Sequence, residues 1–240
     1  MEQISVVIPV YNRAKIFARA LESVVHQSYR PLQIIVIDDG STEDIASVCE
    51  LSKQMNNFAE VELIYRRQKN SGAPTARNRG LTEAKGEYVI FWDADAVGEP
   101  QMLEKMHHAL VQNPNASFAY SNFLFGKKNM RGKTFSFEAL KQRNYIMSTS
   151  LIRTKDAILW DETLKRFQDW DLWLTMAEHG KKGVWIDEVL FQVETDGTMS
   201  SWLPSFVYQA PFRWLPYIRK RILKYEQARQ IILNKHKISF

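Results

Sequence analysis

A short apolar run that ends on two carboxylates restricts the fold of this chain more than any other stretch. Val89 to Trp92 are four apolar β-formers, enough for a buried strand and too few for a helix, and Asp93-Ala94-Asp95 follows directly. Ligands of open α/β sheets bind beyond the carboxyl ends of the strands. Two hard oxygen donors placed there suit Mg²⁺ or Mn²⁺ bridged to phosphates, and the small Ala94 lets a ligand approach the backbone. Taken alone, an Asp-x-Asp is more often a plain polar turn than a metal site, so the choice between the two depends on the rest of the sequence.

The residues before this strand alternate between strand-like and helix-like patterns. Strands are predicted at 4–10, 32–37, 61–65 and 89–92, and helices at 14–27, after Thr42 as an N-cap, and at 75–84. Such alternation predicts βαβ units with right-handed crossovers and a parallel sheet. The carboxylates that end the strands are then expected on one rim.

The pattern is less regular from residue 100 onward. A helix is predicted at 100–111, strands at 117–125 and 147–152, and a basic turn at 126–132 that leads into another strand-like piece. A helix is predicted from 167 to 180, and two short strands within 183–193. The acceptor half of a substrate site would come from this part of the chain.

The composition is that of a globular protein. The chain has 240 residues, of which 45% are hydrophobic and 25% charged, and this fits one large α/β domain with or without a modest tail. The single cysteine, Cys49, excludes an internal disulfide and suits a reducing compartment. Neither a signal-peptide pattern nor a run of about 18 apolar residues is found, so we expect a cytoplasmic protein without a transmembrane helix.

The positive charge is concentrated near the C-terminus. Of the net charge of +5, residues 201–240 contribute +7 and residues 1–200 contribute −2. We therefore predict a domain at 1–200 and a basic amphipathic helical extension at 201–240. One helical stripe of that extension holds the apolar residues Leu215, Ile218, Ile222, Tyr225 and Ile232. Such a helix favours a peripheral position on the inner face of the cytoplasmic membrane, with a helix packed on the domain as the alternative.

Two further polar groups lie where the predicted rim would bring them. Asp38 and Asp39 end the second strand. A local turn or helix cap is the alternative for Asp38, whereas Asp39 suits recognition of a nucleobase N–H by a charged acceptor. Asn70, Gly72 and Arg77 lie at the start of the third helix, where backbone N–H groups and a guanidinium make a phosphate or ribose site. An ordinary surface charge is the alternative for Arg77.

Asp169 is the third carboxylate of interest, and it opens an amphipathic helix beside Trp170. Transfer of a group to a hydroxyl needs a base that takes the proton while a metal holds the charge of the departing phosphate. A carboxylate in an apolar pocket rimmed by aromatic residues can be that base. Spacing alone favours a helix N-cap, with Asp171 as a neighbour that the helix dipole stabilises.

Five motifs occur in one order: residues 5–13, residues 35–42, Asn70-x-Gly72 with Ala76-Arg77-Asn78, Asp93-Ala94-Asp95, and residues 168–174. The set resembles the family 2 glycosyltransferases, which have the GT-A fold. The resemblance implies an α/β protein in which a Rossmann-like nucleotide-binding sheet merges with an acceptor-binding half. It further implies an inverting, metal-dependent transfer from a nucleotide-sugar, mostly a UDP-sugar, to a hydroxyl. The Gln-Asp-Trp-Asp-Leu-Trp variant is similar to transferases of bacterial surface polysaccharide assembly, so a glycan or lipid-linked acceptor is expected.

The same resemblance implies roles for individual residues. The nucleotide-sugar would be bound by Pro9, Tyr11, Asp39, Asn70, Gly72, Arg77, Asp93 and Ala94. Asp95, together with Asp93, would bind Mn²⁺ or Mg²⁺, and Asp169 would be the catalytic base. Gln168 and Trp170 would lie on the acceptor side. The family commonly has Glu where this chain has Gln168, and we interpret the change as a subgroup trait because the base that follows is kept.

Two other functions compete with this interpretation. A sugar nucleotidyltransferase would favour a glycine-rich loop with Lys or Arg after the first strand, and this chain has Tyr11-Asn12-Arg13 without glycine. A basic membrane adaptor or nucleic-acid-binding protein is suggested by the pI of about 9.2. It would leave the acidic rim unexplained, because carboxylates repel phosphates unless a metal intervenes. We therefore expect a nucleotide-sugar and its acceptor as partners, and no nucleic acid.

Overall fold

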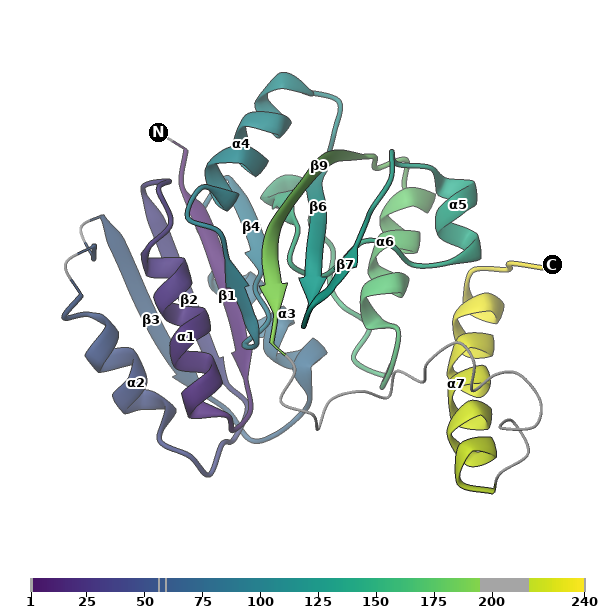
Figure 1. Ribbon diagram of the computed structural model, residues 1–240, viewed down its shortest axis with the longest axis horizontal. Coiled ribbons are helices and arrows are strands. Elements are labelled where there is room, and N and C mark those ends of the chain that lie inside the picture. Colours follow the sequence, from purple (N-terminus) through teal and green to yellow (C-terminus); the bar gives the residue numbers. More distant parts are fainter. Residues whose placement is uncertain (1, 56, 59, 195–215, 240) are drawn as a thin grey trace.

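The computed structural model describes residues 2–55, 57–58, 60–194 and 216–239, and these form one nine-stranded sheet with helices on both faces (Figure 1). The first half contains β1 Ile4–Val10, α1 Ala14–Val25, β2 Leu32–Asp38, α2 Ile45–Ser52, β3 Val61–Arg67, α3 Ala73–Glu83, β4 Tyr88–Phe91 and β5 Ala96–Gly98. The second half contains α4 Met102–Gln112, β6 Phe118–Phe125, β7 Lys128–Met130, α5 Phe137–Gln142, β8 Leu151–Arg153, α6 Gln168–Glu178, β9 Gly183–Val193 and α7 Pro216–Lys235.

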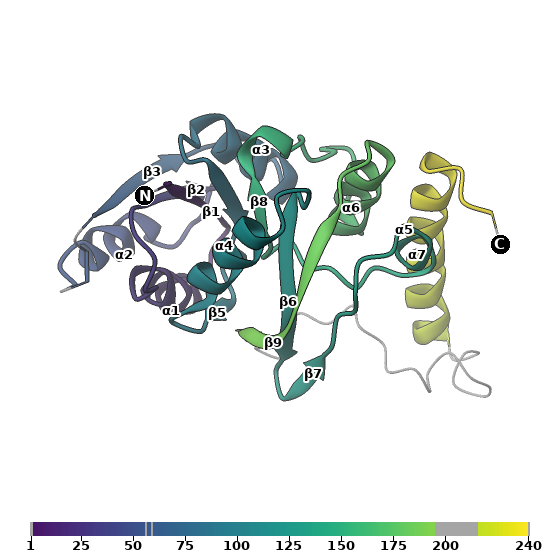
Figure 2. The ribbon, with the colours of Figure 1, turned by 90° about the horizontal axis from the view of Figure 1, so that it is seen from above.

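The first half is the predicted parallel sheet. Its strands lie in the order β3-β2-β1-β4, and in the register Val7 lies between Ile35 of β2 and Phe91 of β4. Figure 2 shows α1 and α2 on one face of these strands and α3 on the other. The chain steps outward from β1 to β3 and then returns through α3 to β4, so the strand order reverses beside β1. Ligands bind at such a reversal in open α/β sheets.

The second half extends the same sheet with mixed directions. β8 pairs antiparallel with β4 and with β6, β6 pairs parallel with β9, and β5 pairs antiparallel with β9. β9 is one strand and not the two that we expected. Asp187 and Glu188 lie where the register with β6 shifts between Ser121 and Asn122, so the strand continues past these two charged residues.

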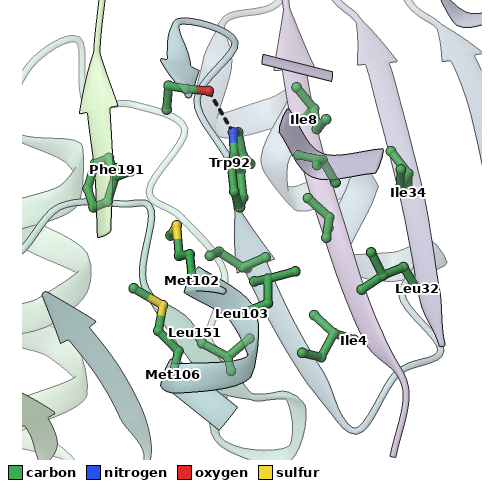
Figure 3. Packing of buried hydrophobic residues seen from close by; sticks show 14 of the residues in the cluster. Ile4, Ile8, Leu32, Ile34, Trp92, Met102, Leu103, Met106, Leu151 and Phe191 are labelled. Carbon is green, nitrogen blue, oxygen red and sulfur yellow. Dashed lines mark hydrogen bonds between the residues drawn. The ribbon is translucent and has the colours of Figure 1, made fainter. Parts of the chain in front are cut away.

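Alternating side chains of the strands form two cores, one on each face of the sheet. Figure 3 shows part of the first core, where Trp92 packs with Met102, Leu103 and Phe191. Val7, Ile35 and Phe91 point to the second core, beneath α3 and α6. Because the strands are covered on both faces, their sequences are continuous apolar runs, which explains why they could be predicted.

Several local predictions need correction. Thr42 does not cap α2: the N-cap is Asp44, whose side chain accepts the N–H of Ser47. The strand predicted at 147–152 is reduced to β8, and β5 and α5 were not predicted because three- and six-residue elements carry too little periodicity. The basic turn at 126–132 is tighter than expected, since Phe125 already pairs with Lys128 of β7.

The C-terminal extension is helical, as predicted, and α7 lies beside α6 (Figure 1). Ile222 and Ile232 of the predicted stripe are 3% and 0% exposed, and Ile232 lies in the core that contains Trp170 and Trp173 of α6. Leu215, the predicted boundary between residues 200 and 201, and the side chain of Ile218 lie outside the described residues. Among the helices in the described part of the chain, none is both long and apolar enough to cross a membrane.

Candidate active site

The Asp93-Ala94-Asp95 segment forms a tight turn between β4 and β5. The N–H of Ala96 donates to the carbonyl oxygen of Asp93 at 2.9 Å, which closes the turn. Trp92, fully buried just before it, donates its indole N–H to the carbonyl oxygen of Ala96 at 2.8 Å (Figure 3). The buried ring of Trp92 therefore holds the turn through this hydrogen bond, and the two carboxylates lie at the carboxyl end of β4.

Asp93 is oriented by two neighbours. Its Oδ1 accepts a hydrogen bond from Nη2 of Arg77 at 2.7 Å, and its Oδ2 accepts one from Oγ of Ser148 at 2.7 Å. Arg77, on α3, is only 8% exposed and stacks over the ring of Trp160, with Cζ 4.4 Å from the centroid. The guanidinium is therefore not an ordinary surface charge, because its partners hold it against the end of β4.

Asp95 carries an only partly compensated charge. Its side chain is 13% exposed, and Nη1 of Arg13 lies 3.6 Å from Oδ2, beyond ordinary hydrogen-bond distance. Burial, together with the nearby charge of Asp93, raises the pKa of Asp95 to about 6. A cation bound between Asp93 and Asp95 would relieve this cost, so the donor set fits a hard divalent ion.

The protein offers only part of a coordination shell. Within the described residues no group of three or more His, Cys, Asp or Glu side chains could hold a metal ion. Mg²⁺ and similar ions are commonly held by one or two carboxylates, with substrate phosphates and water supplying the other ligands. The two carboxylates of the turn match that pattern and do not match a closed structural metal site.

Asp169 lies in the first turn of α6 and is not its N-cap. The N-cap is Phe167, whose backbone is left-handed at φ 57° and ψ 28°. Oδ2 of Asp169 accepts a hydrogen bond from Nδ2 of Asn144 at 2.8 Å, and Oδ1 accepts one from the N–H of Trp170 at 2.9 Å. The residue is partly exposed, yet burial raises the pKa of its carboxyl to about 6, against the opposing hydrogen bond from Trp170.

The predicted acidic residues of the two halves meet around Arg77. Its Nη2 bonds Asp93, and its Nη1 lies 3.3 Å from Oε1 of Gln168. The charge of Asp93 contributes to the raised pKa of both Asp95 and Asp169. The carboxylates of the turn and that of α6 therefore share one electrostatic environment, although more than seventy residues separate Asp95 from Asp169 in the chain.

Asp39 is buried, and both of its carboxylate oxygens already accept hydrogen bonds from the protein. It is 3% exposed, and its Oδ1 accepts hydrogen bonds from Nε2 of Gln68 and the N–H of Ser71, at 2.8 and 2.9 Å. Its Oδ2 accepts the N–H of Gly72 at 2.8 Å, so Asp39 ties the end of β2 to the start of α3. Gly72 has φ 94°, a backbone conformation that other residues rarely adopt, and this explains a glycine at this position.

The other residues predicted to bind the nucleotide lie near Asp39 or in the turn after β4. Pro9 lies in β1 opposite Ile37, and Tyr11, just after β1, is 53% exposed. Asn70 is exposed and lines a surface recess together with Gly40, Arg67, Gln68 and Lys69. Ala94 is partly exposed within the turn. Asp38, in contrast, is fully buried, and its Oδ1 accepts the N–H of Ser41 at 2.8 Å, which is the local-turn alternative.

Trp170 is buried in the core next to α5 and does not line the site. It is 3% exposed, and its indole N–H donates to the carbonyl oxygen of Leu140 in α5 at 2.7 Å. Its ring is therefore not available to an acceptor in this structure. Gln168 is partly exposed and bonds Arg77, which places it between the two sets of carboxylates.

Three residues of the site were not found from the sequence: Asn144, Ser148 and Trp160. Each acts on a carboxylate or on Arg77 across at least 25 residues of chain. None belongs to a motif, and the segment 144–148 was partly assigned to a strand. Only the pairing of β8 with β4 and β6 brings this segment to the site.

Comparisons with known proteins agree with this geometry. The sequence profile described as glycosyl transferase family 2 matches residues 5–173. An uncharacterized glycosyltransferase of Rickettsia felis is 29% identical in an alignment of 218 positions that covers 84% of this chain and 34% of that protein. A GalNAc(5)-diNAcBac-PP-undecaprenol beta-1,3-glucosyltransferase of Campylobacter jejuni is 28% identical over 157 residues, which are 65% of this chain and 49% of that protein. The chain spans about a third of the length of the first of these relatives.

Two solved structures share the fold. TarS 1-349 of S. aureus in complex with UDP superposes with a TM-score of 0.64 at 23% identity, covering 80% of this chain and 60% of that one. The mannosyltransferase PcManGT of Pyrobaculum calidifontis, in complex with GDP-Man and Mn²⁺, gives a TM-score of 0.61 at 15% identity, covering 99% of this chain and 69% of that one.

Proposed function

This chain belongs to glycosyl transferase family 2 and has the GT-A fold, and we propose that it is a glycosyltransferase whose transfer is inverting and metal-dependent. In this proposal the donor is a nucleotide-sugar, most simply a UDP-sugar, and the acceptor is a hydroxyl of a glycan or lipid-linked glycan in cell-surface polysaccharide synthesis. The observation that carries the proposal is the arrangement of two carboxylates after β4 opposite a separate desolvated carboxylate, Asp169, on α6.

Asp169 is the proposed catalytic base. A carboxyl whose pKa is about 6 is ionised at neutral pH and still accepts a proton more readily than an ordinary aspartate. Its hydrogen bond from Asn144 fixes the orientation of the carboxylate. An acceptor hydroxyl placed against Asp169 would lose its proton as it attacks C1 of the donor sugar, from the face opposite the leaving diphosphate, which inverts the configuration there.

Asp93 and Asp95 are the proposed metal-binding residues, with Mn²⁺ or Mg²⁺ as the ion. A divalent ion held there would neutralise charge that develops on the departing diphosphate. Arg77 keeps one oxygen of Asp93 in place, and Arg13 lies close enough to Asp95 to add positive charge on the same side. A metal-bound relative, the mannosyltransferase with Mn²⁺, has the same fold.

The nucleotide would lie across the ends of β1 and β2. Asp39 makes one hydrogen bond through Oδ2 to Gly72, and each carboxylate oxygen has two lone pairs, so this oxygen can accept a second N–H from a base edge. The exposed ring of Tyr11 offers a face against which a base can stack. Pro9, Asn70, Gly72 and Ala94 complete this proposed site. TarS, which was solved with UDP, has the same fold.

The extension is proposed to bring the enzyme near a membrane-bound acceptor. Because Ile222 and Ile232 are buried, any contact with anionic lipid would use exposed basic residues such as Arg219 and Lys220. The printed name of the Campylobacter relative describes a lipid-linked acceptor, which supports a similar class here. The division into residues 1–200 and 201–240 also remains a proposal.

The binding of UDP tests the metal site directly. We expect UDP to raise the melting temperature only when Mn²⁺ or Mg²⁺ is present, and we expect Asp95→Asn to abolish that metal-dependent part. Glu50→Gln, an exposed carboxylate on α2, is the matched control and should leave the shift unchanged. An equal UDP shift in chelator and in the Asp95→Asn protein would contradict the proposal. A hydrolysis screen over UDP-, GDP- and dTDP-sugars then identifies the donor.

A further inference from the structure

The end of α7 is joined to α6 by a cluster of charges, of which His236 and Asp171 are buried and the others partly exposed. Nζ of Lys235 lies 2.6 Å from Oδ2 of Asp161 and 2.8 Å from Oδ1 of Asp171. Nε2 of His236 lies 2.9 Å from Oδ1 of Asp171, and Nδ1 lies 2.9 Å from Oε1 of Glu178. The side chains of His236 and Asp171 are only 2% and 5% exposed. A buried histidine that bridges two carboxylates of another helix is more than a surface ion pair.

Asp171 connects this cluster to the proposed base. It follows Asp169 by two positions, and side chains two apart on an α-helix point to nearly opposite sides. Asp169 faces Asn144, whereas Asp171 faces Lys235 and His236. The first turn of α6 is thus held from both sides, by the segment before β8 and by α7.

A second contact holds the residue just before this turn. Phe167, the left-handed N-cap of α6, packs its ring against that of Tyr225 in α7, with centroids 5.1 Å apart and planes at 76°. A bulky residue at φ 57° is strained and persists only where its surroundings hold it. Ile232 and Leu233 of α7 belong to the same core as Trp170 and Trp173 of α6. α7 therefore supports α6 at its start and along its side.

We propose that Lys235 and His236 are positioning residues for the transfer: through Asp171 they hold the first turn of α6 so that Asp169 keeps its place against Asn144. This inference rests on the proposed role of Asp169 as the base. It assigns the C-terminal helix to the catalytic half of the molecule, as a support of the acceptor side.

The contact of His236 depends on its protonation. Ionised carboxylates only accept hydrogen bonds, so both ring nitrogens can donate only when the imidazole is charged. Burial lowers the pKa of His236, but its bonds to Asp171 and Glu178 outweigh this, and the net pKa is raised above 6.5. The groups that face it are these two carboxylates, with Lys235 beside it and Asp161 bound to Lys235. A raised pKa means that this support is complete below pH of about 6.5 and is lost as pH rises through the higher value in the folded protein.

The test compares His236→Gln, Lys235→Gln and the conservative Lys235→Arg, with Lys224→Gln, an exposed charge on the same helix, as the control. Hydrogen exchange of the α6 amides and steady-state kinetics are measured on each folded protein. We expect His236→Gln and Lys235→Gln to speed exchange in the first turn of α6 and to lower kcat by about 10- to 100-fold, as displacement of a catalytic group does. The KM for the donor should change little. Lys235→Arg should recover most of the rate, and Lys224→Gln should match the unmodified protein.

The pH profile gives a readout that a merely structural role would not move. In the unmodified protein kcat should fall on the alkaline side as His236 loses its proton, and His236→Gln should lack that fall. Unchanged α6 exchange and unchanged kcat in both Gln variants would overturn the positioning role, even if Asp169→Asn is inactive. If instead Asp169→Asn is fully active, the proposed function fails, while the exchange data still decide whether α7 holds α6. Should His236→Gln fail to fold, Lys235→Gln against Lys235→Arg carries the same test.

Discussion

The two halves of the site are held in place by different kinds of structure. On the proposed donor side, Asp93 follows β4, whose residues are in register with β1, and the turn is anchored by a buried tryptophan. On the proposed acceptor side, Asp169 lies on a helix whose position depends on contacts with three separate segments. These contacts come from Asn144, from the carbonyl oxygen of Leu140 and from the end of α7. Sheet hydrogen bonds thus fix the donor side, and tertiary contacts fix the acceptor side.

The comparison teaches where variation is tolerated. A residue at the end of a central strand is held by backbone hydrogen bonds that most side-chain changes leave intact. A residue on a helix supported by single contacts moves when any of them is lost, so the acceptor side should respond to distant substitutions. The two halves should therefore separate in mutational experiments, with binding of the nucleotide assigned to one and turnover to the other.

The largest difference between the effect on turnover and the effect on UDP binding is expected for Asp169→Asn. Loss of a general base costs about 10²- to 10⁴-fold in rate, and kcat should fall by that amount. UDP binding in the presence of Mn²⁺, measured by calorimetry, should stay within a factor of a few because the donor side lies on other elements. Undiminished turnover would remove the assignment of the base, and a parallel loss of UDP binding would break the division into two halves.

A smaller effect is expected for Asn144→Ala. The amide of Asn144 donates to Asp169 and so favours its ionised form, which means that its loss should raise the pKa of that carboxyl further above about 6. Since the base must be ionised, the acidic fall of kcat should move to higher pH, and kcat near pH 7 should drop about tenfold, the size expected for one hydrogen bond to a charged group.

Ser148→Ala is the matched control for this variant, because Ser148 donates to Asp93 on the donor side. It should weaken metal-dependent UDP binding and leave the acidic fall of kcat where it is. An acidic fall that moves equally in both variants would show that the two halves titrate as one unit.

The last effect concerns stability and leaves turnover aside. The pKa of Asp95 is raised from 3.8 to about 6, so its contribution to stability is complete below the unfolded value and is lost as pH rises through 6, a cost of up to roughly 3 kcal/mol. Asp95→Asn should therefore raise the melting temperature at pH 8 in chelator, by several degrees, and leave it unchanged near pH 4. Asp187→Asn is the control, and its melting temperature at pH 8 should move in the opposite direction. The hydrogen bond and ion pair with Arg131 lower the pKa of Asp187, so its ionised form stabilises the fold. A lower melting temperature for Asp95→Asn at pH 8 would show that the ionised carboxylate of Asp95 stabilises the fold, which contradicts this prediction.

The donor side could be predicted from the sequence almost element by element. The strands at 4–10 and 32–38 are continuous apolar runs because both faces are covered, and polar residues begin where each strand leaves the sheet. The predicted rim with Asp39, Asp93 and Asp95 followed from that alternation alone. The predicted N-cap was wrong because two loops are hydrogen-bonded to each other there. The N–H of Thr42 donates to Asn12 in the loop after β1, and Asp44 caps α2 instead.

The acceptor side could be predicted only in part. The helix that carries Asp169 was predicted from its amphipathic pattern, but its supports were not, because Asn144 and His236 carry no local pattern that distinguishes them from surface residues. The apolar stripe of α7 was found as well, and of its two interpretations the helix packed on the domain holds for Ile232, which lies in the core with Trp170. A stripe indicates that a helix buries one face and says nothing about which surface covers it.

The amino-acid sequence by itself determined the parallel sheet, its acidic edge and the identity of the carboxylates, since these follow from apolar periodicity and from residue type at strand ends. Tertiary structure alone decided which side chains orient those carboxylates, how far burial raises their pKa values, and that the C-terminal helix packs on α6. The physical reason is that hydrogen bonds between distant segments and the loss of solvent depend on how the whole chain packs. No single stretch of sequence contains that information.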